Sequence, residues 1–195
     1  MYVDPTGNIF ITISLLAAMG VAAVVGAGLG IAGTFLSDVI NWLVTGEWAW
    51  SAWEEYLGNA IGGAFGGMLS LFTFAGPYIG AVVAGTFGTF FGLSIGKYTG
   101  SNNKSWTEIL EETGISLGIS LLTAGLTKYA KLPGITKGSH SWQQVFNSGF
   151  SKTIKYGYNM SIKTLAKGGG YLLVSGISVG YLTDSIFKGF IRSQF

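Results

Sequence analysis

The sequence predicts an all-α protein in which Gly-rich apolar helices, including a helical hairpin, precede a basic amphipathic helical C-terminal half. Three observations lead to this prediction. Charged residues make up only 10% of the 195 residues and 32 residues are glycine, whereas ordinary soluble domains are about 25% charged and about 7% glycine. Two stretches, residues 5–37 and 56–96, carry no charge. All 11 Lys and Arg lie at or after Lys97.

This uneven charge divides the chain into three predicted regions: a short N-terminal segment at 1–8, an apolar helical region at 9–96, and a basic region at 97–195 that includes an apolar segment near its end. A helix needs about 20 apolar residues to cross a bilayer core, and both charge-free stretches are longer. A chain whose charge is so asymmetric favours a membrane or another acidic surface. We therefore expect the protein at a membrane, with the lipid bilayer as a partner.

Residues 9–36 form the first apolar run and are expected to be one helix, long enough to cross a bilayer with tilt or with a bend at a glycine. Residues 38–56, which follow, are acidic and rich in tryptophan. Tryptophan beside apolar runs is typical of the interface between membrane and water, although a small aromatic core patch is the alternative. The predicted interfacial residues are Trp42, Trp48, Trp50 and Trp53.

Residues 52–96 predict the helical hairpin, with a capping box from Ser51 to Glu54 at its start and Gly76 and Pro77 between its arms. Small residues recur every four positions, so one face of each arm is almost bare of side chains and lets backbones touch. Each interior glycine costs a helix in water about 1 kcal/mol relative to alanine. Close packing must offset this cost, either in lipid or, as the alternative, in a tight soluble bundle. The predicted zipper residues are Gly58, Gly62, Gly66, Gly76, Gly80, Gly88, Gly92 and Gly96.

The basic half opens with a capping box from Ser105 to Glu108, which predicts a helix to about Lys128. Its uncharged part is short for a span, so we expect it at the membrane surface. A basic amphipathic helix follows His140, for which a core-facing soluble helix is the alternative. The run 168–183 could form a marginal last span that ends at Asp184 and Lys188. The lysines expected to dock on anionic lipid, at about 1 kcal/mol each, are Lys128, Lys131, Lys137, Lys152, Lys155, Lys163 and Lys167.

Residues suited to catalysis are scarce, and we expect no enzyme, no cofactor and no metal site. The chain has no Cys and one His, His140, which excludes thiolate chemistry. Glu108 and Glu112 share a helix face and could act with His140 as acid and base, but a helix N-terminus favours acids for its dipole alone. Residues 28–33 match GxGxxG without the βα units that a dinucleotide site requires. A single Arg argues against nucleic acid as a partner.

The opening residues MYVDPTGN, at positions 1–8, resemble the end of the RHS-repeat-associated core of bacterial polymorphic toxins. In that family a YxDPxG sequence closes a large β-repeat shell, and an effector domain begins directly after it. Residues 134–167 also resemble a Gly-, Ser- and Lys-rich segment near the C-terminus of some Gram-positive toxins of this kind. The resemblance implies a secreted effector for competition between bacteria and a cognate immunity protein that neutralises it. The glycine hairpin is similar to those of toxins that depolarise membranes.

We therefore expect an antibacterial toxin domain that inserts into the membrane, assembles into a homo-oligomer and forms a pore or leak. Two alternatives stay open. One is a non-toxic membrane translocation or packing module of a larger RHS toxin. The other is a small hydrolase or nuclease effector that uses His140 with the acids near Glu108.

Overall fold

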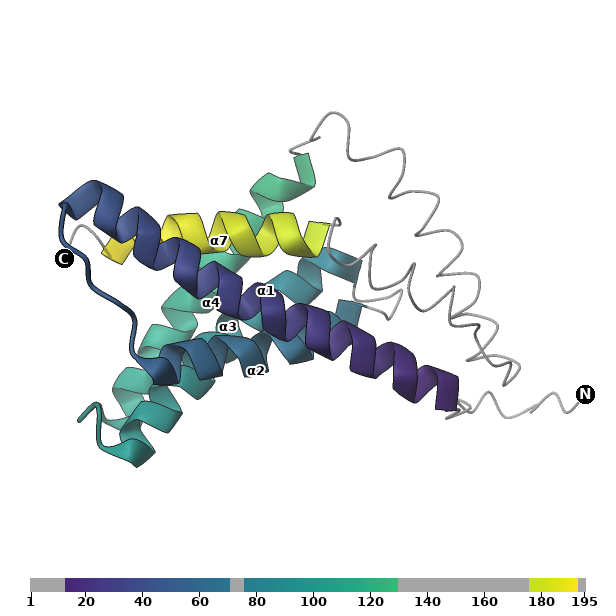
Figure 1. Cartoon of the computed structure of the whole chain (residues 1–195), viewed down its shortest axis with the longest axis horizontal. Helices are drawn as coiled ribbons and strands as arrows, with labels where there is room; N and C mark the ends of the chain where they lie inside the picture. The colour runs from purple at the N-terminus through teal and green to yellow at the C-terminus, as the bar shows by residue number, and fades with distance from the viewer. Residues whose placement is uncertain (1–12, 71–75, 130–175, 193–195) are drawn as a thin grey trace, which may run out of the picture.

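The computed structural model describes residues 13–70, 76–129 and 176–192, and every regular element in these ranges is a helix. The all-α prediction is therefore confirmed. α3 packs against α2, α4 and α7, and α1 packs against α2 and α7 (Figure 1). The helices are α1 (Ile13–Thr45), α2 (Trp53–Ser70), α3 (Gly76–Thr99), α4 (Trp106–Tyr129) and α7 (Gly176–Arg192).

α2 and α3 form the helical hairpin that the sequence predicts. The described part of α2 runs from Trp53 to Ser70, and residues 71–75, the last of the expected first arm, lie outside the described residues. α3 begins at Gly76, which puts Pro77 in its first turn, where the missing N–H costs nothing. α3 ends at Thr99 because Gly100 has a positive φ of 79° and so provides the left-handed residue that commonly ends a helix.

α1 is longer than the apolar run at 9–36, because it continues through Asp38 to Thr45. The Asp38 carboxylate is buried, and it accepts hydrogen bonds from the Ser51 N–H at 3.0 Å, the Ser51 hydroxyl at 2.6 Å and the Tyr56 hydroxyl at 2.7 Å. A buried carboxylate is tolerated when such donors satisfy it. The chain after α1 folds back to supply them, so the helix does not stop at this charge.

α4 begins with the capping box that the sequence predicts. The Ser105 N–H donates to the Glu108 carboxylate at 2.6 Å, and the Glu108 N–H donates to the Ser105 hydroxyl at 3.2 Å. The Ser105 donor, together with the positive charges of Lys104 and Lys97, lowers the pKa of Glu108 below its ordinary value. The two reciprocal bonds satisfy N–H groups that have no partner within the helix.

Ser105→Ala is expected to lower the free energy of unfolding by about 1 kcal/mol, because a cap acceptor is lost. The ionised Glu108 carboxylate adds to the free energy of unfolding, and this stabilisation is fully present above the unfolded-state pKa of about 4.3. It is lost as the pH falls through the lower folded-state pKa. Thermal unfolding followed by circular dichroism at pH 7 and pH 3 measures both effects, with Thr107→Ala in the same exposed turn as the control. A melting temperature unchanged by Ser105→Ala at pH 7 would contradict the cap.

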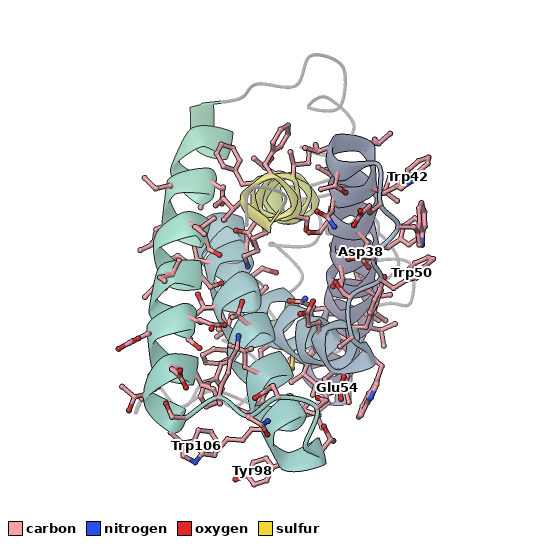
Figure 2. All side chains as sticks on the ribbon, turned by 90° about the vertical axis from the view of Figure 1, so that its left-hand side faces the viewer. Asp38, Trp42, Trp50, Glu54, Tyr98 and Trp106 are labelled. Atoms are coloured by element: carbon pink, nitrogen blue, oxygen red, sulfur yellow. The ribbon has the colours of Figure 1, made fainter. Side chains whose placement is uncertain are left out.

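α7 differs from the expected last span. The expected last span ends at Asp184 and Lys188, whereas α7 runs from Gly176 to Arg192 and carries both residues in its interior. Gly189 brings α7 close to α1, since a Cβ at Gly189 would lie 3.0 Å from the Ser37 carbonyl oxygen and 3.2 Å from Ile40. Figure 2 shows α7 end-on between α4 and α1. Asp184 therefore lies within a helix that continues beyond the predicted run.

The distribution of side chains in the bundle is the reverse of that in a soluble domain, which buries Ile, Leu and Phe. Among the described residues, the buried apolar ones are five alanines and Ile109. By contrast, 25 large apolar or aromatic side chains of the described helices and loops are exposed, with Val24 at 73% and Leu122 at 71%. The buried polar residues are Thr34, Asp38, Asn41, Ser51, Glu54, Ser94, Ser116, Ser120, Thr123, Asp184 and Ser185.

Two helices within the described residues are long and apolar enough to cross a membrane. They are Leu16–Thr45 in α1 and Ile79–Thr99 in α3. α2, the other arm of the hairpin, has 18 residues with Glu54 and Glu55 in its first turn and is not among them.

Candidate functional site

α2 and α3 approach so closely that their backbones are in contact. A Cβ added at Gly62 would lie under 3.0 Å from backbone atoms of Ala84 and Gly88, a separation that real Cβ atoms essentially never show. Glycine is therefore required for this packing, as it is where two helices in a membrane cross closely. The facing residues are Gly58 with Gly88 and Gly92, Gly62 with Ala84 and Gly88, and Gly66 with Gly80 and Ala84.

Two of the predicted zipper glycines lie elsewhere. A Cβ at Gly96 would meet Asn102 and Ser101 in the loop after α3, so this glycine faces the loop and not α2. The loop closes there because the Ser101 N–H donates to the Gly96 carbonyl oxygen at 2.9 Å and the Asn102 side-chain amide donates to the Leu93 carbonyl oxygen at 3.0 Å. Gly76 is the first residue of α3, next to the segment outside the described residues.

A second glycine contact joins α1 to α2. A Cβ at Gly26 would lie under 3.0 Å from the Gly63 backbone. A Cβ at Gly30 would likewise lie under 3.0 Å from the Asn59 backbone. A Cβ at Gly67 would meet the carbonyl oxygen of Ala22. The signal in the sequence is the spacing of four between Gly26 and Gly30 and between Gly63 and Gly67. Gly30 belongs to the GxGxxG match, so this glycine serves helix packing.

Asn59 links the three helices α1, α2 and α3. Its side-chain amide donates to the Thr34 hydroxyl of α1 at 2.9 Å. A Cβ at Gly88 of α3 would meet the side-chain oxygen of Asn59, so the Asn59 side chain fills space that glycine leaves open. A polar side chain in this position is satisfied by a neighbouring helix, as an apolar surrounding requires.

Asp184 and Lys188 lie four residues apart on α7 and form an ion pair, which we call the inner ion pair. Its two side chains also bond to α4 and α3. Their charged atoms lie 2.8 Å apart. Asp184 also accepts from the Ser120 hydroxyl at 3.0 Å, and Lys188 donates to the Gly85 carbonyl oxygen at 3.4 Å. A Cβ at Gly85 would lie 2.9 Å from Asp184, so glycine makes room for the pair. The Ser116 hydroxyl also donates to Gly85, at 3.2 Å.

The inner ion pair lines a cavity of about 260 Å³ to which all five helices contribute. We call it the polar cavity, because its walls consist of glycines, hydroxyl side chains, Asn59 and charged residues, with Leu93 as the one large apolar side chain among the described residues that line it. Gly30 and Gly33 of the GxGxxG match lie in its wall. The charged residues of the wall are Glu55, Lys104, Glu112, Asp184 and Lys188.

A second ion pair lies in the wall of the polar cavity, and we call Lys104 and Glu112 the outer ion pair. Their charged atoms are 2.7 Å apart. The Glu112 side chain is 41% exposed, whereas that of Asp184 is 8% exposed. The cavity therefore extends from a charged pair that water reaches to a charged pair that is largely enclosed.

The predicted interfacial tryptophans lie on the surface. Ring centroids of Trp42 and Trp48 are 4.9 Å apart, and those of Trp48 and Trp50 are 5.0 Å apart. Each of the three side chains is at least 40% exposed, and Trp53 is 57% exposed. The alternative of a buried aromatic core patch is therefore wrong, and Figure 2 shows Trp42 and Trp50 at the outer edge of α1.

A second aromatic cluster, not predicted from the sequence, lies between the end of α3 and the start of α4. Tyr98 and Trp106 have ring centroids 5.9 Å apart, and the Lys97 ammonium lies 5.7 Å from the centre of the Trp106 ring. In Figure 2 both rings lie at an outer edge, well away from Trp42 and Trp50. The signal in the sequence was the position of Tyr98 and Trp106 on either side of a short polar loop.

One of the seven predicted lipid-docking lysines lies in a described helix. Lys128 lies in the last turn of α4. Outside the described residues lie Lys131, Lys137, Lys152, Lys155, Lys163 and Lys167.

The candidate acids for catalysis have separate partners, because Glu108 binds Ser105 and Glu112 binds Lys104. His140 lies outside the described residues. In the part of the chain that the structure describes, no group of three His, Asp or Glu side chains could hold a metal ion.

No protein-family model matches the chain, and comparison with curated proteins and with solved structures finds no match either. The glycine contacts, the exposed apolar surface and the polar cavity are therefore the observations from which a function follows.

Proposed function

We propose that this chain is an antibacterial toxin domain that inserts into the membrane of a target cell and lets ions leak across it. The observation that carries the proposal is the reversed distribution of side chains, with small and polar residues inside and large apolar residues outside. In lipid, outward apolar side chains are favourable, and polar groups must find partners within the protein. The bonds to Asp38 and Asp184 provide such partners.

The size of the apolar surface favours lipid over water. Burying a Leu, Ile or Phe side chain is worth about 1.5–3 kcal/mol, and 25 large apolar or aromatic side chains are exposed, most of them by about half. Covering what remains exposed gains roughly 1 kcal/mol for each, so the total exceeds the 5–15 kcal/mol that stabilises an ordinary domain. Lipid is a partner that covers helices on several sides of the bundle at once.

The aromatic clusters fit the same placement. Trp and Tyr rings collect where a membrane meets water, and the exposed clusters at Trp42 and at Trp106 lie at the ends of the two helices that could cross. The resemblance of residues 1–8 to the end of an RHS core supports secretion and delivery into a competing cell, with an immunity protein as partner. We expect the lysines from Lys128 to Lys167 to dock on anionic lipid first.

Expression of residues 1–195 in bacteria tests the proposal. We expect growth arrest together with loss of membrane potential, measured with a potential-sensitive dye. Changing Gly80, Gly88 and Gly92 to Leu should abolish both effects, because all three glycines face α2 at close range and leucine side chains there would push α2 and α3 apart. The matched control changes Gly28, Gly114 and Gly118 to Leu, since a Cβ at these three glycines meets nothing within 4 Å.

The other outcomes separate the alternatives. Harmless residence in the membrane would indicate a translocation or packing module in place of a toxin. Arrest at full membrane potential that His140→Ala removes would indicate an enzyme. Undiminished depolarisation by the variant with leucine at Gly80, Gly88 and Gly92 would refute the role of the glycine contacts in the leak.

A further inference from the structure

We infer that the ions cross through the interior of each copy, along the polar cavity, and that the charges in its wall set the preference between cations and anions, with the largest influence from Asp184 and Lys188 of the inner ion pair. This inference rests on the proposed membrane leak. It concerns the route of the ions and the residues that select them.

The packing of the glycines favours a route within one copy over a route between copies. The glycine faces of α2 are already in backbone contact with α1 on one side and α3 on the other, as Gly26 with Gly63 and Gly62 with Gly88 show. These faces are therefore not available to join separate copies. The outer surface carries large apolar side chains such as Val24 and Leu122, which would make a poor lining for ions.

The polar cavity has the dimensions of an entrance for ions. Its wall on α3 extends from Gly85 to Leu93, which is about 12 Å at 1.5 Å per residue. Its volume of about 260 Å³ holds several water molecules, which occupy about 30 Å³ each in the liquid. The side chains of the outer ion pair are 38% and 41% exposed and those of Lys188 and Asp184 are 26% and 8% exposed, so the inner ion pair is the more enclosed of the two.

The charges in the wall predict which ions enter. The residues that line the cavity include three carboxylates, of Glu55, Glu112 and Asp184, and two ammonium groups, of Lys104 and Lys188. The wall therefore carries a net charge of one negative, which favours cations. A charge acts more strongly on an ion in an enclosed, low-dielectric site than in bulk water, so the inner ion pair should have the largest influence. Rings of charged side chains select ions in channels by the same effect.

The experiment measures reversal potentials of the full chain in planar bilayers across a KCl gradient. We expect the native protein to favour K⁺. Lys188→Met removes the positive charge and leaves Asp184, so the K⁺ to Cl⁻ permeability ratio should increase by about tenfold, the scale of one unit charge at close range. Asp184→Asn keeps the shape and leaves Lys188, so the ratio should fall by a similar factor. General damage to the fold would not shift the ratio in opposite directions.

Two neighbouring acids on α4 provide a matched pair for the outer end. Glu112 lines the polar cavity, whereas Glu111 does not and its side chain is exposed. Glu112→Gln should lower the permeability ratio, and Glu111→Gln should leave it unchanged. Because Glu112 is partly exposed, its replacement decides the question even where the variants of the inner ion pair do not insert.

Each result distinguishes this inference from the function on which it rests. Conductance of the native protein with the same permeability ratio in Lys188→Met, Asp184→Asn and Glu112→Gln would overturn the route through the polar cavity and leave the leak intact. A native protein without conductance would overturn both. Equal shifts in Glu111→Gln and Glu112→Gln would show that surface charge sets the ratio, and would also overturn the route.

Discussion

Gly62→Ala is expected to lower the free energy of unfolding by about 1–3 kcal/mol, the cost of forcing a methyl group into a packed interior. The three atoms nearest to the added Cβ are backbone atoms of Ala84 and Gly88, so no side chain can rotate to make room and α2 must move away from α3. The gain in helix propensity, about 1 kcal/mol for alanine over glycine, offsets only part of this cost. The ion leak should also be lost, because α2 and α3 would no longer pack as a hairpin.

Gly118→Ala is the matched control, because it adds the same methyl group to a helix where a Cβ meets nothing within 4 Å. It should leave stability unchanged or raise it by up to about 1 kcal/mol. Both variants are compared by thermal unfolding in detergent micelles, followed by circular dichroism at 222 nm, a wavelength that reports helix content. Equal melting temperatures for Gly62→Ala and Gly118→Ala would show that the backbones of α2 and α3 are not in contact.

Asp184→Ala is expected to have the largest effect on stability, a loss of about 3–5 kcal/mol, the scale of removing one partner from a buried ion pair. The change leaves the Lys188 ammonium without its carboxylate and removes the acceptor of the Ser120 hydroxyl. Both groups then lie beside Gly85 in a confined space. The unfolding midpoint in detergent measures the loss.

The double variant Asp184→Leu with Lys188→Met separates the charge from the packing. Replacing both members of a buried ion pair by apolar residues of similar size is often neutral or stabilising, so this variant should recover most of the stability that Asp184→Ala loses. It should also keep the K⁺ preference of the native protein, because removing one carboxylate and one ammonium leaves the excess of one carboxylate in the wall of the polar cavity unchanged. A double variant as unstable as Asp184→Ala would show that the contacts of α7 depend on the charges themselves.

The hairpin could be predicted because the face on which a residue lies depends only on its spacing from near neighbours in the sequence. Residues four apart lie on one face of a helix, so the series from Gly58 to Gly66 and from Gly80 to Gly92 indicated two smooth faces before any contact was known. The capping box from Ser105 to Glu108 was predictable for the same reason, since its bonds join residues three apart. Only the structure showed that the second glycine face of α2 packs on α1, because spacing in the sequence does not show which helix a face contacts.

The polar cavity was not predictable, because its residues come from distant parts of the chain. Asp184 lines this cavity and Asp38 is buried elsewhere in the bundle, yet in the sequence each directly follows a charge-free run. Their donors lie far away in the sequence, 13 residues for Ser51 and 64 residues for Ser120. A helix continues through a carboxylate when such donors satisfy it, and local spacing carries no information about them.

The sequence by itself determined that the chain is helical, which helix faces are smooth, and that apolar residues far outnumber charged ones. Those properties depend on spacing and composition within single helices. Only the tertiary structure decided that many large apolar side chains face outward and that Asp38 and Asp184 are buried. The physical reason is that a buried charge requires partners, and here they come from segments distant in the sequence, Ser51 and Tyr56 for Asp38 and Ser120 for Asp184.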